Sequence, residues 1–336
     1  MNKDIQLTGL GNALVDLQYE VQEHELADLE FEKGAMTLVD VAKQKEVIAK
    51  FEDRMHNRCS GGSAANTIIA FAAFGGKAAY KTHLGADDFG DFYFKEFEEL
   101  GIHLHAEKIN SDPTGTSFVM ITPDSERTML TMLGASAKHT KEHIDDEIIK
   151  RSEWLYIEGY KFSEHGSTEA VHHAVNVCKN NNTKIAVTFS DKFIIDVFRE
   201  RLEYAVNHAD LIFCNDVEAR AYTQIHDVQE AFEKLCEIVP NVVVTKGSEG
   251  SLVKWDGKVY EIPAYEAKLI DTTGAGDMYA GGFLYGIINS GDPHIAGHLG
   301  SYAASLIVSQ LGARLDQDHG LVRDKILDDH KNGKLV

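Results

Sequence analysis

Residues 271–277 (Asp-Thr-Thr-Gly-Ala-Gly-Asp) combine the residue types that phosphate chemistry needs. Small and apolar residues follow them, so we predict a glycine-rich turn that opens a helix. The unpaired backbone N–H groups and the helix dipole at such a turn favour an anion. Gly274, Ala275 and Gly276 would surround a phosphoryl group, because glycine lets the backbone approach a ligand closely.

Asp277 lies in the first turn of this predicted helix. A carboxylate at the mouth of a site that only bound phosphate would be out of place. It is useful if it removes a proton from a hydroxyl group that attacks a phosphoryl group. We therefore predict that Asp277 is a general base. The alternative is that its charge only complements the helix dipole.

Several other polar residues and glycines come directly after, or at the end of, predicted strands. They are Asn12, Asn215, Asp216, Glu218, Thr245, Lys246 and Gly247. In an open parallel sheet, ligands bind outside the carboxyl ends of the strands. The common placement of these residues, together with the turn at 271–277, predicts a single site.

Near the N-terminus, Asn12 and Asp16 are interpreted as groups that hydrogen-bond a polyol; turn formation is the alternative. Residues 9–14 begin like a dinucleotide-binding fingerprint. The third glycine is missing and a strand is predicted to follow, which argues against a dehydrogenase.

The glycine-rich segment 59–66 is predicted to enter an apolar helix at 67–74. Gly62 and Ser63 would let a sugar ring approach the backbone, and Asn66 would bond its hydroxyl groups. A helix start without a ligand explains the same residues equally well.

Asn215 and Glu218 lie on one side of a predicted first helical turn. Together they would orient water on a Mg²⁺ ion that bridges ATP phosphates. The alternative is a capping box, which has the same spacing. Arg127, on a predicted hairpin, would balance charge on a transferred phosphoryl group.

Composition limits the classes of function. The chain has 336 residues, of which 43% are hydrophobic, and a formal net charge of −20. This size suits one domain over residues 1–336, and the charge disfavours binding to nucleic acid or to an anionic membrane. The four cysteines form no C-x-x-C pair, and neither a signal peptide nor a membrane span is predicted, so we expect a cytoplasmic protein. The sixteen histidines contain no H-E-x-x-H and are interpreted as core or solvated residues rather than ligands.

The order of predicted elements indicates the fold class. Strands and helices alternate from residue 154, which predicts a doubly wound, mostly parallel α/β sheet with helices on both faces. Early strands and a hairpin formed by 116–122 and 127–133 predict a small β-strand lid, from roughly 14–40 and 112–133. The charged tail from residue 316 is predicted to fray.

Three of these segments resemble signatures of the ribokinase-like (PfkB) carbohydrate and purine kinases. Residues 271–277 are similar to the C-terminal signature, 61–66 to the N-terminal signature, and 215–218 to the N-x-x-E motif. The order and spacing agree over nearly the whole chain.

The resemblance implies a ribokinase-like fold and roles for individual residues. Asp277 would be the base, and Gly274, Ala275 and Gly276 would form the anion hole. The acceptor would be held by residues near the N-terminal signature, namely Asn12, Asp16, Gly62, Ser63 and Asn66. Phosphates, Mg²⁺ and nucleotide would contact Asn215, Glu218, Thr245, Lys246 and Gly247. Asp271 and Thr273 match the ligands of a monovalent cation, commonly potassium.

Within the family, the chain is most similar to the adenosine kinases. Residues 11–16, 113–116, 126–129 and 302–305 resemble that branch, and so do 190–193, whose Phe193 would line the base pocket. Arg127 matches the branch's phosphate-facing arginine. Glu158 and Asp191 depart from the pattern, and sugar kinases often have a glutamate near the first position that binds a sugar hydroxyl.

The resulting prediction is an ATP-dependent kinase that phosphorylates a primary hydroxyl group and converts adenosine to AMP. A ribokinase- or fructokinase-like sugar kinase is the alternative, and a non-catalytic ligand sensor on the same fold is the further one. The predicted cofactors are ATP, Mg²⁺ and, as an option, K⁺. The sequence leaves both a monomer and a homodimer open.

Overall fold

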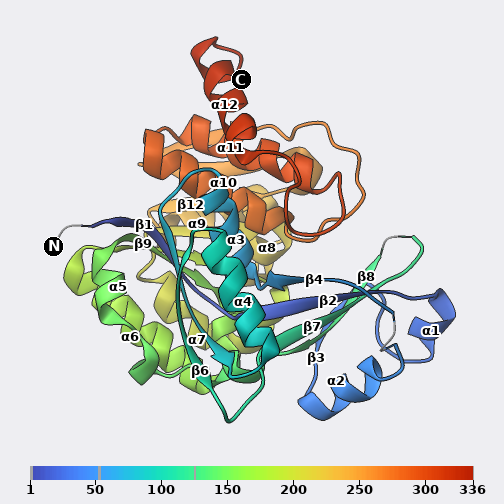
Figure 1. The fold of residues 1–336 in the computed structure, drawn as a ribbon. Coiled ribbons are helices and arrows are strands. Elements are labelled where there is room, and N and C mark those ends of the chain that lie inside the picture. The colour runs from blue at the N-terminus through green and yellow to red at the C-terminus, as the bar shows by residue number, and fades with distance from the viewer. Residues whose placement is uncertain (1–2, 52–53, 125, 336) are drawn as a thin grey trace.

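The computed structural model describes residues 3–51, 54–124 and 126–335, whose strands form two sheets (Figure 1). The larger sheet has the order β14-β13-β12-β11-β10-β9-β1-β5-β6. Its strands are β1 Ile5–Leu10, β5 Ala78–Gly85, β6 His103–Ile109, β9 Ser152–Glu158, β10 Lys184–Thr188, β11 Leu211–Asn215, β12 Asn241–Thr245, β13 Ser251–Trp255 and β14 Lys258–Ile262. Neighbouring strands are parallel from β6 to β12, and β13 and β14 form an antiparallel hairpin at one edge. The predicted α/β fold is confirmed.

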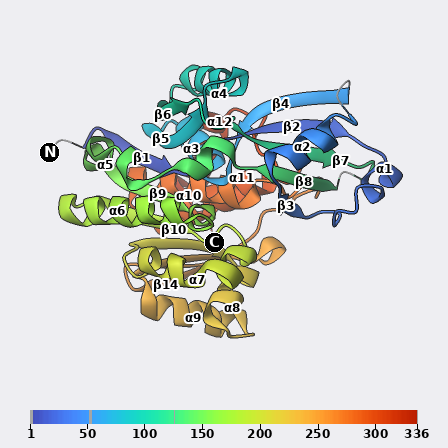
Figure 2. The ribbon, with the colours of Figure 1, turned by 90° about the horizontal axis from the view of Figure 1, so that it is seen from below.

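Helices cover both faces of this sheet, which explains its nearly continuous apolar strands (Figure 2). One face packs against α3 Ser63–Ala73, α4 Asp88–Glu99, α10 Ala275–Ser290 and α11 Pro293–Ile307. The other packs against α5 Asp146–Arg151, α6 His165–Asn181, α7 Lys192–Val206, α8 Asp216–Thr223 and α9 Val228–Ile238. Successive side chains of a strand enter opposite cores: Tyr156 packs on the first face, and Leu155 and Ile157 on the second.

The second sheet, with the order β3-β8-β7-β2-β4, extends to the right of the main body in Figure 1. Its strands are β3 Met36–Leu38, β8 Arg127–Met132, β7 Gly115–Ile121, β2 Leu14–Glu20 and β4 Met55–Gly61. The predicted hairpin of β7 and β8 is confirmed, while Ser125 in its turn lies outside the described residues. The helices α1 Glu23–Ala27 and α2 Val41–Ile48 flank the sheet, and Gln44 of α2 donates hydrogen bonds to two strand carbonyls, those of Thr116 and Leu130.

Two sequence-based predictions were wrong. Residues 59–61 belong to strand β4 rather than to a helix entry, and α3 already begins at Ser63. This segment is polar and contains glycine, so its sequence alone does not indicate a strand; it is ordered by antiparallel pairing with β2. The C-terminal tail forms helix α12 His319–Lys331 rather than fraying, since its Val322 and Ile326 are buried against the body of the protein. The range predicted for the lid therefore omits one strand of the second sheet.

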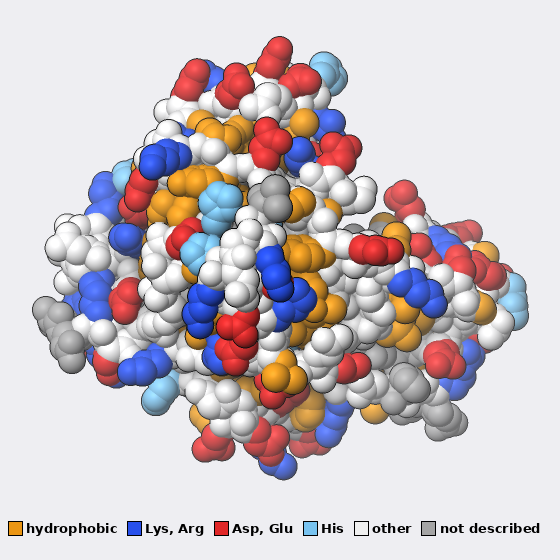
Figure 3. All heavy atoms as spheres, turned by 90° about the horizontal axis from the view of Figure 1, so that it is seen from above, with side chains coloured by type: hydrophobic (Ala, Val, Ile, Leu, Met, Phe, Trp, Pro, Cys, Tyr) orange, Lys and Arg blue, Asp and Glu red, His pale blue; other side chains and the backbone are white. Residues whose placement is uncertain are grey.

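The chain changes direction across the main sheet between β1 and β9: β1 is followed outward by β5 and β6, and β9 by β10 to β12. A crevice forms at the carboxyl ends of the strands where such a reversal occurs. No helix in the described part of the chain has the length and apolar character needed to cross a membrane. On the face in Figure 3, acidic and basic side chains are interspersed.

Candidate active site

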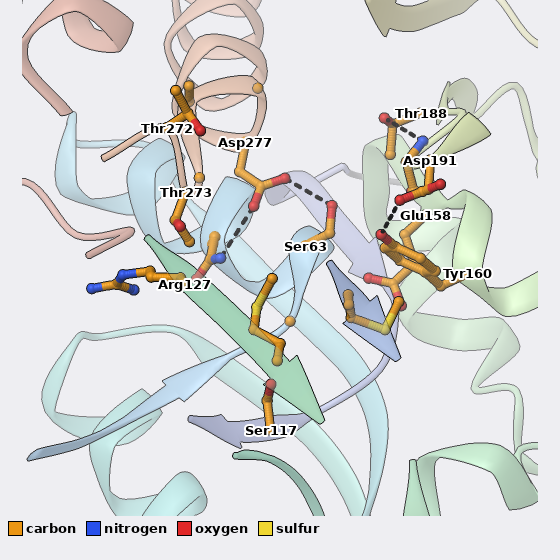
Figure 4. Close-up of a pocket in the computed structure, with 18 of the residues that line it drawn as sticks. Ser63, Ser117, Arg127, Glu158, Tyr160, Thr188, Asp191, Thr272, Thr273 and Asp277 are labelled. Carbon is orange, nitrogen blue, oxygen red and sulfur yellow. Dashed lines mark hydrogen bonds between the residues drawn. The ribbon is translucent and has the colours of Figure 1, made fainter. Parts of the chain in front are cut away.

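A cavity of about 590 Å³ lies where the carboxyl ends of the main strands face the second sheet. Its walls include the ends of β9 to β12, the first turns of α3 and α10, and residues of β2, β3, β7 and β8. Segments more than two hundred residues apart in the sequence thus supply one lining (Figure 4). The single site predicted from strand ends is present as a cavity.

The glycine turn at 274–276 opens α10 as predicted. Gly274 is the N-cap residue and has a φ of 75°, and a Cβ on it would lie 2.6 Å from the Cβ of Ala313. Only glycine accepts both conditions without strain. Among the described residues, no atom outside the turn lies within 4 Å of the position that a Cβ of Gly276 would take, so this part of the turn is open for a ligand. Gly274, Ala275 and Gly276 all line the cavity. The N–H of Ala275 donates to the carbonyl of Thr272 at 3.2 Å, which leaves the N–H groups of Gly274 and Gly276 for an anion.

Asp277 is held by two side chains from the first turn of α3. The Ser63 hydroxyl donates to Oδ1 at 2.7 Å, and Asn66 Nδ2 donates to Oδ2 at 3.1 Å (Figure 4). Burial raises the pKa of Asp277 to about 6, against the opposing effect of these two hydrogen bonds. A carboxylate with this pKa is mostly ionised at neutral pH and accepts a proton more readily than an ordinary aspartate.

The start of α3 approaches the loop after β1 closely. Gly62 has a φ of 108°, and a Cβ there would lie 2.2 Å from the carbonyl oxygen of Asn12. The same carbonyl accepts a hydrogen bond from the hydroxyl of Tyr80 at 2.9 Å. A glycine is thus required at position 62, because any side chain would collide with the backbone of Asn12. This close approach of the two loops places Ser63 and Asn66 beside Asp277.

Glu158, at the end of β9, joins these two loops. Its Oε1 accepts from the backbone N–H of Asn12 at 2.6 Å, and its Oε2 accepts from that of Ala64 at 2.9 Å. Nearby, the buried Lys161 donates to Asn12 Oδ1 and to the carbonyl of Ser136. Burial raises the pKa of Glu158 and lowers that of Lys161. Both carboxylate oxygens of Glu158 already accept main-chain hydrogen bonds, although the residue also lines the cavity.

Asp16 projects into the cavity from β2. A Cβ on the neighbouring Gly61 would lie 2.5 Å from its Oδ2, so the glycine makes room for this carboxylate. Burial raises the pKa of Asp16 to about 7, opposed by the charges of Arg127 and Arg314 and reinforced by that of Asp277. A carboxyl group in this state can accept or donate a hydrogen bond to a ligand hydroxyl near neutral pH.

Arg127 forms a buried ion pair with Asp271, with Nε and Oδ2 3.0 Å apart. The same Oδ2 accepts from the backbone N–H of Gly312 at 2.8 Å, and Oδ1 accepts from that of Thr273 at 2.9 Å. The guanidinium group therefore lies at the edge of the glycine turn, as expected for a group that neutralises phosphoryl charge. The predicted cation ligands Asp271 and Thr273 are adjacent, but the carboxylate already has three partners.

Asn215 and Glu218 form the capping box that the alternative interpretation describes. Asn215 Oδ1 accepts from the backbone N–H of Glu218 at 2.8 Å, and Glu218 Oε2 accepts from the backbone N–H of Asn215 at 3.0 Å. Both residues also line the cavity. Burial raises the pKa of Glu218 to about 7, against the effect of the Asn215 amide. The box thus fixes an acidic oxygen at the cavity wall.

The described lining is strongly acidic. Among the described lining residues, Arg127 is the only lysine or arginine. The carboxyl groups in the lining are those of Asp16, Glu126, Glu158, Asp191, Glu218, Asp271 and Asp277. A polyphosphate entering this cavity would meet net repulsion unless a cation accompanied it. Hard carboxylate oxygens suit Mg²⁺. The residues present therefore fit a magnesium–nucleotide complex, with Glu218 as the predicted carboxylate next to the ion.

The structure brings most, but not all, of the predicted residues together. Asp216, Lys246, Gly247 and Phe193 are absent from the described lining. Asp216 is ion-paired with Arg220, Lys246 and Gly247 lie in the turn after β12, and Phe193 is 44% exposed. Phe193 follows Asp191, the N-cap of α7, and its ring packs edge-on against Phe198 instead. The roles predicted for Lys246, Gly247 and Phe193 remain predictions.

Sequence reasoning missed two features of the site. The hydroxyl of Tyr160 donates to Asp191 Oδ2 at 3.4 Å across the cavity wall (Figure 4). Lys161 was missed because a charged residue in a short helical segment is ordinarily exposed, whereas this one is 1% exposed. Its position directly after Glu158-Gly159-Tyr160 was the available signal.

Known kinases are similar to this chain in sequence and in fold. The model of the pfkB family carbohydrate kinases matches residues 35–319. An adenosine kinase from Saccharomyces cerevisiae is 27% identical over 327 residues, which cover 91% of this chain and 95% of that protein. Among solved structures, a probable sugar kinase from Rhizobium etli is 28% identical with a TM-score of 0.88 and full coverage of both chains. An adenosine kinase from Sinorhizobium meliloti is also 28% identical with a TM-score of 0.88, over 96% of this chain and 99% of that one.

Proposed function

The chain belongs to the pfkB family of carbohydrate kinases, and we propose that it transfers the γ-phosphoryl group of ATP to a primary hydroxyl group of adenosine. The observation that carries the proposal is the position of Asp277. Its carboxylate lies in the first turn of α10, directly after the glycine turn, and accepts hydrogen bonds from Ser63 and Asn66. A base and an anion site thus face the same space.

In the proposed reaction, the acceptor oxygen attacks the γ-phosphorus while its proton passes to Asp277, and the bond to the β–γ bridging oxygen breaks to release ADP. The amides of Gly274 to Gly276 and the Arg127 guanidinium stabilise the charge on the transferred group. Mg²⁺ bound with the nucleotide supplies further charge neutralisation, and Glu218 is the residue that would hold it through water. The second sheet acts as a lid that limits hydrolysis of ATP by water.

Two observations favour a nucleoside over a free sugar. The cavity wall contributed by β2, β3, β8 and the residue after β8 carries the aliphatic side chains of Leu14, Met36, Leu38, Met129 and Leu133. A flat purine can pack against such a wall, whereas a free sugar has no comparable apolar face. Both carboxylate oxygens of Glu158 accept hydrogen bonds from main-chain N–H groups, so the presence of this residue is explained without a sugar ligand. The carboxyl group of Asp16 and the side-chain Nδ2 of Asn12 remain as partners for ribose hydroxyls.

The test is ADP release with Mg-ATP over adenosine, other nucleosides, ribose and fructose, with the phosphorylated product identified by mass spectrometry. AMP formation from adenosine supports the proposal. Turnover of a free sugar with none of adenosine would overturn the acceptor and favour the sugar-kinase alternative. ATP and acceptor binding without turnover would favour the non-catalytic sensor.

A variant separates the two acceptor classes. Leu38, which is 41% exposed, lines the cavity, and Leu38→Ala should raise the KM for adenosine about fivefold, because roughly 1 kcal/mol of apolar contact is removed. Leu100, at 38% exposure on the far end of α4, is the matched control, and Leu100→Ala should leave KM unchanged. Equal KM values in all three proteins would contradict contact between the base and this wall.

A further inference from the structure

Outside the kinase cavity, three potential metal ligands converge on the face of strands β5 and β6. His83 on β5 and Glu107 on β6 are register partners in parallel strands, so their side chains leave the sheet side by side. The third residue, His143, belongs to the 3₁₀ turn η3 Lys141–His143, which lies next to these two side chains. One ligand atom from each residue can be chosen so that all three lie within 4.8 Å of one another.

His83 gives a second, independent indication of a ligand. The residue is fully buried, and neither of its ring nitrogens has a hydrogen-bond partner among the described residues. Buried polar atoms in folded proteins are normally paired, so an unpaired pair of nitrogens calls for a partner that is not part of the chain. The ring is held in place by stacking on His139, with centroids 4.7 Å apart, and by an edge contact with His143 at 4.3 Å.

His143 is hydrogen-bonded within its own turn. Its Nδ1 accepts the backbone N–H of Thr140 at 3.1 Å and lies 2.9 Å from the hydroxyl oxygen of Thr140, which donates to Glu142 Oε2 at 2.7 Å. In this arrangement Nε2 carries the ring proton. Binding of a metal at Nε2 would move that proton to Nδ1, where the Thr140 oxygen can accept it in place of the backbone N–H contact. A hydrogen-bonded partner on the second ring nitrogen is typical of histidines that bind metals.

We propose that His83, Glu107 and His143 bind one divalent transition-metal ion of the Zn²⁺ class, with water as a further ligand. Two imidazoles and a carboxylate are a ligand set that this class of ion accepts in tetrahedral geometry. The observed ligand atoms are somewhat wider apart than in a loaded site, so binding would draw η3 toward the strands. It would also displace the 3.7 Å ion pair between Glu107 and Lys81.

The ion would stabilise the segment that connects the second sheet to the kinase cavity. This segment contains η2 Gly134–Lys138 and η3, directly after β8. Ser136 in η2 exchanges hydrogen bonds with the backbone of Ala13, and its carbonyl accepts from Lys161. A metal at His143 would therefore act as a structural clamp. This inference is independent of which acceptor the kinase uses, and it revises the sequence-based interpretation of these two histidines.

The test uses full-length protein without a histidine tag, stripped with a chelator and titrated with Co²⁺. We expect one equivalent to bind with the strong visible absorption of four-coordinate cobalt, and the melting temperature to rise. His143→Gln should abolish both signals, and Thr140→Val should weaken binding about 10–100-fold. His173→Gln is the matched control, because His173 is also partly exposed and pairs with an aspartate, Asp146.

The two histidine variants decide the outcome. Binding that is lost in His143→Gln and kept in His173→Gln supports the site. Absence of stoichiometric binding to the unmodified protein, or equal binding by the two variants, would overturn it. Since His143 is only partly buried, its replacement should leave the fold intact, which circular dichroism can verify.

Discussion

Replacing Ser63 by alanine should change the pH dependence of catalysis more than its maximum. The Ser63 hydroxyl donates a 2.7 Å hydrogen bond to Oδ1 of Asp277 and thereby favours the ionised carboxylate. Without this bond, burial is opposed only by Asn66, so the pKa of Asp277 should rise above its value of about 6. A hydrogen bond to a charged group is worth roughly 1.5–3 kcal/mol, and water entering the gap would recover part of it, which leaves a rise of about one pH unit.

The sign of the effect follows from the role of the base. Only the ionised carboxylate accepts a proton, so activity falls as pH drops through the pKa. With a rise of about one unit, the ionised fraction of Asp277 at pH 6 falls from about one half to about one tenth, a loss of about fivefold. At pH 8 the Asp277 carboxyl group is at least about 90% ionised in both proteins. The assay is kcat/KM for the acceptor at saturating Mg-ATP from pH 5.5 to 8.5.

Ser117→Ala is the matched control, because Ser117 lines the same cavity but bonds Thr131 at 3.1 Å rather than Asp277. Its pH profile should coincide with that of the wild type. An apparent pKa that is unchanged or lower in Ser63→Ala would show that the Ser63 hydroxyl does not stabilise the ionised form of Asp277, whatever the change in KM. A pH-independent loss would indicate that Ser63 only contacts the acceptor.

Three further predictions concern other parts of the site. Gly274→Ala should lower the free energy of unfolding by about 1–3 kcal/mol, because φ is 75° and the added methyl group would contact Ala313. Urea denaturation measures this change. Gly276→Ala is the control and should lower the free energy of unfolding by less, because its methyl group would lie within 4 Å of no described atom outside the turn. Arg127→Gln should reduce kcat about 10²–10³-fold in steady-state kinetics, because the positive charge next to the glycine turn is lost. Arg58→Gln on β4 is the control and should keep the wild-type kcat. Equal kcat values for the two variants would exclude Arg127 from the reaction. Glu218→Gln should raise the Mg²⁺ concentration for half-maximal activity about 10–100-fold. Asp216→Asn is the control, because Asp216 is ion-paired with Arg220 on α8. An unchanged Mg²⁺ requirement would leave Glu218 with its capping role alone.

The elements of the site that depend on local sequence were predictable. A glycine turn between a polar segment and an apolar run indicates a helix start, and the start of α10 at Ala275 agrees with this. Asn215 and Glu218 have the spacing of a capping box, and the structure contains that box. Alternation of apolar strands and helices was enough for the doubly wound sheet.

Features that depend on distant partners were not predictable in this way. The hydrogen bonds of Asp277 join residues 214 and 211 positions away, so no local pattern assigns Ser63 and Asn66 to it. Strand β4 has no apolar alternation, because its order comes from pairing with β2. Burial of Lys161 depends on the convergence of three loops, and the unpaired nitrogens of His83 become apparent only when the segment 134–143 covers β5.

In the proposed mechanism Asp277 removes the proton from the acceptor, and the decisive variant is Asp277→Asn. The variant keeps the size of the side chain, and kcat should fall about 10²–10⁴-fold while ATP and the acceptor bind within a few-fold of wild type by calorimetry. Asp191→Asn, a carboxyl group on the same cavity wall, is the control and should keep most of its activity. Wild-type turnover by Asp277→Asn would contradict the mechanism.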